Sequence, residues 1–166
     1  ERASALELVR EAGALEVEAA TTEEERRRQW EARHQAYWAL VHLFPGHRFL
    51  ITDTAVPLSR LPEMVRFAQG LLREMGLTGN ILGHVGDGNC HPRIPVLLED
   101  YPQAEASAER LVEKALELGG TCTAEHGVGL RKRKFLPKEH GPALEWMRRL
   151  KALFDPEGLL NPGKVV

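Results

Sequence analysis

The 166-residue sequence has little of several features that mark specialised protein classes. Its two cysteines, Cys90 and Cys122, have no C-x-x-C spacing, which excludes a disulfide framework and favours a reducing, cytoplasmic setting with two buried thiols. Lys and Arg (22) do not outnumber Asp and Glu (24), so the basic excess typical of nucleic-acid binding is missing and no nucleic-acid partner is expected. No apolar run approaches the roughly 20 residues of a membrane span, and the first residues do not form a signal peptide.

What is present indicates an ordinary folded domain. Hydrophobic residues make up 43% of the chain and charged residues 28%, which is typical of a packed globular protein. The length predicts a single domain over residues 1–166, at roughly 150 residues per domain. Because the chain starts at Glu1 without an initiator Met, we expect it to be a piece of a longer protein.

Apolar spacing and turn residues predict the secondary structure. The expected elements are a short helix around Leu6 and Val9, an edge strand at 15–20, a helix from the capping box at Thr22 to about Leu43, a strand at 50–56, a helix at 61–75, strands at 80–86 and 90–97, a helix at about 101–118 and a last helix at 144–154. This order predicts an α+β fold with helices covering a largely antiparallel sheet.

The segment from Gly83 to Pro92 is the most informative. If Asp87 and Gly88 form the centre of a type I′ turn, His84 lies directly opposite His91, and both imidazoles share one face of the hairpin. Two imidazoles so placed could bind one divalent cation, with Glu125 as a third ligand from a Gly-flanked loop. The simpler alternative is a pair of hydrogen-bonded, partly buried histidines.

Three spaced motifs carry a resemblance to a known family. The motifs are Gly83-His84-x-Gly86-Asp87-Gly88-Asn89-x-His91-Pro92, then Gly119-Gly120 followed by Glu125-His126-Gly127-x-Gly129, and finally Phe154-Asp155-Pro156-x-Gly158-x-x-Asn161-Pro162-Gly163-Lys164. Together with Arg33 and Asp53-x-x-Val56-Pro57, they resemble the C-terminal domain of FAD-linked 2-hydroxy-acid oxidases and dehydrogenases, most closely the FAD subunit of bacterial glycolate oxidase. The resemblance covers nearly the whole chain and implies a ferredoxin-like cap domain with a C-terminal helical segment.

The resemblance also implies residue roles. His84, His91 and Glu125 match ligands of a divalent metal, usually zinc, and His126 matches the base that removes the substrate hydroxyl proton while hydride passes to the flavin. Arg33 matches an arginine that pairs with the substrate carboxylate, against the alternative of a solvated helix residue. Asn161 is expected near the flavin, against the alternative of a simple loop terminator.

FAD is expected mainly in a separate N-terminal domain, because the Gly-rich pyrophosphate loop of that domain has no counterpart in this sequence. The implied partners are this flavin domain, a small 2-hydroxy acid, and further oxidase subunits that include an iron-sulfur subunit. The implied location is cytoplasmic, with a peripheral position at the inner membrane face as the alternative. The isolated chain is expected to be inactive.

The resemblance leaves a choice between two small substrates. Glycolate is predicted first and D-lactate second, because a difference of one methyl group is worth only about 1–3 kcal/mol in a pocket. Arg93 departs from the family pattern, and it either supplies a second clamp for an anionic substrate or faces solvent. A noncatalytic module that binds a metal or a protein partner through the same hairpin is the rival from a different functional class.

Overall fold

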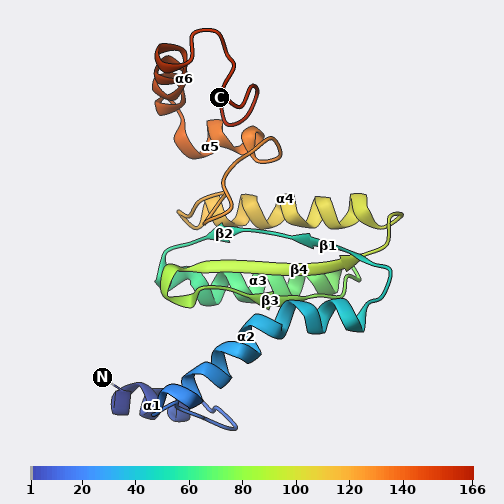
Figure 1. The fold of residues 1–166 in the computed structure, drawn as a ribbon, viewed down its shortest axis with the longest axis vertical. Coiled ribbons are helices and arrows are strands. Elements are labelled where there is room, and N and C mark those ends of the chain that lie inside the picture. Colours follow the sequence, from blue (N-terminus) through green and yellow to red (C-terminus); the bar gives the residue numbers. More distant parts are fainter. Residues whose placement is uncertain (1) are drawn as a thin grey trace. The chain divides into compact units, whose positions relative to one another are not determined.

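The computed structural model describes residues 2–166, with side chains from Ala3 onward, and the chain divides into two compact units (Figure 1). The first unit ends at Pro45 and holds helices α1 (Arg2–Glu11) and α2 (Glu23–Leu43). A complete capping box begins α2: the Thr22 side chain accepts from the Glu25 N–H, and the Glu25 side chain accepts from the Thr22 N–H. Both predicted helices are confirmed.

The second unit, Gly46–Val166, is built around an antiparallel sheet. Its strands are β1 (Arg48–Ile51), β2 (Thr54–Ala55), β3 (Asn80–Leu82) and β4 (Asn89–Val96). The longest strand, β4, is central: β1 and β2 pair with it on one edge, and β3 pairs with it on the other.

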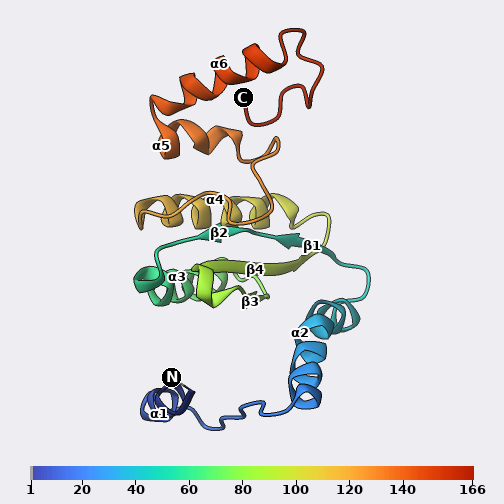
Figure 2. The same ribbon diagram turned by 60° about the vertical axis from the view of Figure 1, so that its left-hand side comes forward.

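Helices α3 (Leu61–Glu74) and α4 (Tyr101–Glu117) run alongside the strands (Figures 1 and 2). Alternate residues of β4 pack against them, because successive side chains of a strand point to opposite faces. Cys90 and Ile94 belong to this buried layer, together with Met64 and Leu71 of α3 and Leu111 of α4. His91 and Arg93 therefore belong to the opposite face of the strand.

The chain ends in α5 (Leu136–His140), α6 (Ala143–Phe154) and an irregular segment. A third buried cluster, which includes Val112, Cys122, Leu136 and Leu144, joins this region to α4. The molecule is thus α+β with helices on a small antiparallel sheet, as predicted. The two cysteines are free and buried, also as predicted.

Two strand predictions are wrong, the predicted strand at 80–86 ends at Leu82, and one helix was not predicted. Residues 15–20 form no strand, since the apolar and acidic alternation there has no neighbouring strand to pair with among the described residues. The predicted strand at 50–56 is interrupted at Thr52 and Asp53, although β1 and β2 keep one register against β4. The short helix α5 was not predicted, because five residues are too few to show a periodic pattern.

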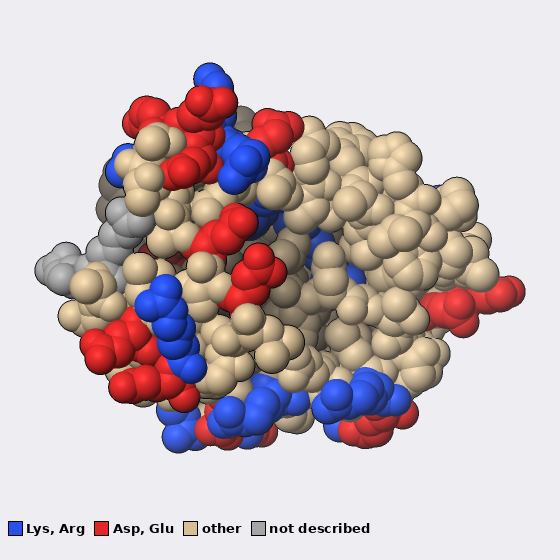
Figure 3. Space-filling view, turned by 90° about the horizontal axis from the view of Figure 1, so that it is seen from below, with Lys and Arg blue, Asp and Glu red and all other residues tan. Residues whose placement is uncertain are grey.

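The prediction that the whole chain is one domain stays a prediction. The described helices include none that is both long enough and apolar enough to cross a membrane. On the face drawn in Figure 3, acidic and basic side chains are interspersed, and neither sign forms a continuous field. This distribution agrees with the near balance of charges in the sequence.

Candidate functional site

The hairpin between β3 and β4 differs from the predicted tight turn. Leu82, and not His84, lies opposite His91. A 3-10 turn at Val85–Asp87 lengthens the connection, and the His84 carbonyl accepts from the N–H groups of Asp87 (2.9 Å) and Asn89 (3.2 Å). The predicted direct pairing of His84 with His91 is therefore wrong. The two rings nevertheless approach, with 6.3 Å between their centroids.

One backbone hydrogen bond is missing from the sheet beside His91, and the free carbonyl binds the His91 ring. The Thr52 N–H donates to the Pro92 carbonyl (3.0 Å), but proline has no N–H to return to the Thr52 carbonyl. That carbonyl instead accepts from Nδ1 of the His91 ring at 2.7 Å. Because a carbonyl can only accept, Nδ1 carries the proton, and the opposite nitrogen, Nε2, points away from the strand.

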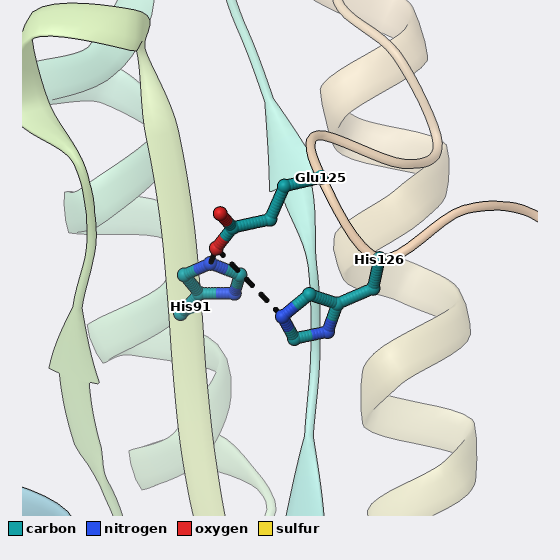
Figure 4. Close-up of side chains that lie close together, drawn as sticks. All are labelled: His91, Glu125 and His126. Atoms are coloured by element: carbon teal, nitrogen blue, oxygen red, sulfur yellow. Dashed lines mark hydrogen bonds and ion pairs between the residues drawn. The ribbon is translucent and has the colours of Figure 1, made fainter.

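Glu125 meets that nitrogen. Its Oε1 lies 2.7 Å from Nε2 of His91, and it lies 3.7 Å from Nε2 of both His84 and His126. Figure 4 shows Glu125 and His126 reaching from their loop toward His91 on β4. The rings of His91 and His126 stack with 5.0 Å between centroids. Three histidines predicted from the sequence thus surround one carboxylate oxygen of the fourth predicted residue, Glu125.

Burial differs sharply within this group. The His91 side chain is 4% exposed, whereas those of His84, Glu125 and His126 are about half exposed. The hydrogen bond from His91 is the largest influence on Glu125, and with the nearby histidines it lowers the pKa of that carboxyl below its ordinary value. The cluster is therefore anchored at one end and open to an incoming molecule at the other.

These residues fit a divalent cation. Suitable ligand atoms of His91, Glu125 and His126 lie within 4.8 Å of one another, and His84 approaches the same oxygen. Imidazole nitrogen with carboxylate oxygen is a donor set that zinc and related transition metals accept. Glu125 and His126 come from a loop with glycines at positive φ on its far side, Gly127 (φ 79) and Gly129 (φ 54).

Asp53 is the residue that the site-residue predictions missed. It is 2% exposed and accepts hydrogen bonds from the loop that carries Glu125 and His126. Burial would raise the pKa of Asp53, but the His126 N–H, the Lys132 charge and the Thr123 hydroxyl lower it to about 2. The sequence pointed to Asp53 only as part of the motif Asp53-x-x-Val56-Pro57, and its contacts become visible once the break between β1 and β2 is known.

Three further residues, Arg93, Asn161 and Arg33, were predicted to contact the substrate or the flavin. Arg93 is on β4, half-buried, with its backbone opposite Ile51 and Asn80. Asn161 lies in the C-terminal segment at φ 48, and its side-chain oxygen accepts from Lys164 Nζ at 3.3 Å. Arg33 lies on α2 in the first unit. Their predicted roles toward substrate and flavin stay predictions.

Comparisons with known proteins identify the family of the chain. The profile of the family described as FAD linked oxidases, C-terminal domain, matches residues 1–165. A probable mitochondrial D-lactate dehydrogenase from Danio rerio is 44% identical over 164 residues, covering 96% of this chain and 33% of that protein. The glycolate oxidase subunit GlcD of Bacillus subtilis is 38% identical over 156 residues, covering 92% of this chain and 33% of that protein.

A solved structure shares the fold. The 4-ethylphenol oxidase from Gulosibacter chungangensis superposes with a TM-score of 0.57 at 17% identity, covering 99% of this chain and 36% of the other. The chain spans about a third of the length of the relatives that it matches. With the family profile matching almost every residue, this chain belongs to the FAD linked oxidases, as their C-terminal domain.

Proposed function

We propose that this chain is the substrate-binding side of a flavin-dependent dehydrogenase of small 2-hydroxy acids. In this proposal His84, His91 and Glu125 hold a divalent cation, and His126 takes the hydroxyl proton. The observation that supports it best is the contact between His91 Nε2 and Glu125 Oε1 at 2.7 Å.

This contact requires something positive between the two atoms. Nδ1 of His91 donates its proton to the Thr52 carbonyl, so the positive charge between Nε2 and Glu125 Oε1 comes either from a second proton on the ring or from a cation. A lone pair and a carboxylate oxygen at 2.7 Å repel each other unless a proton or a cation lies near both. A bound cation would satisfy His84, His91 and Glu125 together, and a proton fixed on Nδ1 by a backbone carbonyl is typical of a histidine that binds a metal through Nε2.

Each residue of the proposed site then has a separate role in the oxidation of the 2-hydroxy acid. A cation at this site would bind the hydroxyl and carboxylate oxygens of the substrate and lower the pKa of the hydroxyl. His126, which is half exposed, accepts the hydroxyl proton at Nε2. FAD, when bound by its own domain, would accept the hydride from the α-carbon, which would leave the 2-oxo acid. Arg33 and Arg93 are proposed to pair with the carboxylate, as a guanidinium does with two parallel hydrogen bonds.

The flavin is proposed to lie in another domain of the same protein. One face of α6 exposes Trp146, Leu150, Leu153 and Phe154, which follow one another at helical spacing. An exposed apolar stripe of this kind marks an interaction surface, and the flavin domain is the occupant that family membership favours. Asn161, just beyond α6, is proposed to approach the flavin from this side. Further oxidase subunits and a cytoplasmic location are proposed with it.

D-lactate and glycolate are the two candidate substrates. Among the relatives, proteins named D-lactate dehydrogenase reach 44% identity and the glycolate oxidase subunit reaches 38%, so D-lactate is supported at least as well as glycolate. We propose a substrate no larger than lactate. The test uses the full-length protein that carries this chain. D-lactate, L-lactate and glycolate would each be added anaerobically, and the absorbance of the flavin would show which of them reduces it.

Variants separate the proposed roles in the same assay. His84→Gln is expected to weaken cation binding, whereas His126→Gln should keep the cation and slow flavin reduction by about 100-fold or more, the usual contribution of a general base. Glu113→Gln, on the exposed side of α4, is the control and should change neither. Cation binding without flavin reduction by any 2-hydroxy acid would contradict the proposal and favour a noncatalytic metal-binding module.

A further inference from the structure

Asp53 accepts hydrogen bonds from several groups of the segment that carries Glu125 and His126. Its Oδ2 accepts from the Thr123 hydroxyl (3.0 Å) and from three consecutive N–H groups, those of Ala124 (3.0 Å), Glu125 (3.2 Å) and His126 (2.9 Å). One buried carboxylate oxygen therefore accepts hydrogen bonds from the backbone of the segment from which Glu125 and His126 project. This segment has no regular secondary structure to hold it otherwise.

The second oxygen connects Asp53 to the hairpin. Asn89 Nδ2 donates to Asp53 Oδ1 (3.2 Å), and Asn89 Oδ1 in turn accepts from the His84 N–H (3.3 Å). Asn89 is 4% exposed, so water does not compete freely for these bonds. A continuous set of hydrogen bonds thus runs from Asp53 to His84 in one direction and to Glu125 and His126 in the other.

A lysine supplies the counter-charge. Lys132 Nζ donates to the Asp53 carbonyl (2.6 Å) and lies 3.5 Å from its Oδ2. Burial lowers the pKa of Lys132, and the charge of Asp53 opposes that effect. A buried carboxylate that is both hydrogen-bonded and paired in this way keeps its charge and its position.

We propose that Asp53 is the positioning residue of the site: by binding the 123–126 segment and, through Asn89, the His84 backbone, it sets the distance between the groups that meet at Glu125. It touches neither substrate nor flavin in this arrangement and acts through the residues that it holds. The inference rests on the proposed function for its consequence in cation binding, but the positioning itself concerns only the chain.

The test compares Asp53→Asn with a matched control in the full 166-residue chain. Asp155 is the control because it is also buried, also accepts two backbone N–H groups (Leu159 and Leu160) and also pairs with a lysine, Lys151, at the far end of α6. Asparagine keeps the size of aspartate but loses the charge and one acceptor oxygen. Loss of folding stability alone should therefore appear in both variants.

Two readouts separate positioning from stability. Amide hydrogen exchange at residues 124–126 in the metal-free chain is expected to rise by about tenfold or more in Asp53→Asn, relative to the amides of β4, and to stay unchanged in Asp155→Asn. Zinc affinity, measured by competition with a chromophoric chelator, is expected to fall by about 10- to 100-fold in Asp53→Asn only, as is usual when a group that orients metal ligands is removed.

Thr123→Val provides a milder variant if Asp53→Asn does not fold. It removes one donor to Asp53 Oδ2 and is expected to raise exchange at 124–126 by a few-fold. If the parent chain binds no zinc while the exchange difference persists, the cation of the proposed function is rejected and the positioning role of Asp53 stands. Equal exchange at 124–126 in the Asp53 and Asp155 variants would overturn the positioning inference.

Discussion

Gly88, at the end of the hairpin that carries His84, should tolerate no side chain. Its φ is +68°, and a Cβ atom at this position would lie 1.9 Å from the Val56 carbonyl oxygen. Gly86, two residues earlier in the same hairpin, has nothing within 4 Å of its Cβ position. The pair Gly88→Ala and Gly86→Ala therefore tests the structure of the hairpin with an identical chemical change.

The magnitude follows from three costs. A left-handed alanine costs about 1 kcal/mol relative to glycine. Moving the Val56 carbonyl away breaks the hydrogen bond from the Val56 N–H to the Gly88 carbonyl (3.0 Å), which is worth about 1 kcal/mol. Val56 is 5% exposed in the core, and displacing it adds about 1 kcal/mol or more of packing strain. We expect Gly88→Ala to lower the free energy of unfolding by about 3 kcal/mol.

Urea denaturation followed by circular dichroism measures this difference. With a slope of about 1–3 kcal/mol per molar urea, the midpoint of Gly88→Ala should fall by at least about 1 M. Gly86→Ala should stay within about 0.5 kcal/mol of the parent chain. Equal midpoints for the two variants would show that Gly88 does not pack against Val56. That result would contradict the positions of His84 and Asn89 in the hairpin.

Other predictions concern groups around the site. The pKa of Asp53 is lowered from 3.8 to about 2, so its ionised form stabilises the folded chain by about 2 kcal/mol. This contribution should be complete above pH about 4 and should be lost as the pH falls toward 2. Urea titrations at several pH values should show a smaller loss of stability in Asp53→Asn. Burial raises the thiol pKa of Cys90 to about 11 and of Cys122 to about 12, so mass spectrometry should find alkylation at pH 8 only after unfolding; rapid labelling of the folded chain would contradict their burial. Pro92→Ala supplies an N–H that competes with His91 for the Thr52 carbonyl, so zinc affinity should fall by about tenfold, while Pro95→Ala on the same strand should leave it unchanged.

Local patterns in the sequence predicted most of the helices because each has enough turns to show its buried side. The stripe through Met64, Leu71 and neighbouring residues identified α3, and the capping box at Thr22 identified the start of α2. The break between β1 and β2 has no such signal, since it depends on Pro92 in a strand 40 residues away.

The site was partly predictable for the same reason. Short motifs around His84, His91, Glu125 and His126 indicated the chemistry, and the structure brings these residues together. Their spacing was not predictable, because the 3-10 turn at Val85–Asp87 shifts His84 out of register with His91. The role of Asp53 depends on hydrogen bonds to residues about 70 positions later, which no local pattern contains.

Zinc stoichiometry tests most directly whether His84, His91 and Glu125 form a cation site. Isothermal titration of the purified, metal-free chain with zinc, beside Glu125→Gln and the surface control Glu113→Gln, gives the number of bound ions and their affinity. We predict one equivalent of zinc in the parent chain and the control, and a loss of affinity in Glu125→Gln. Binding that is absent from the parent chain, or unchanged in Glu125→Gln, would contradict it.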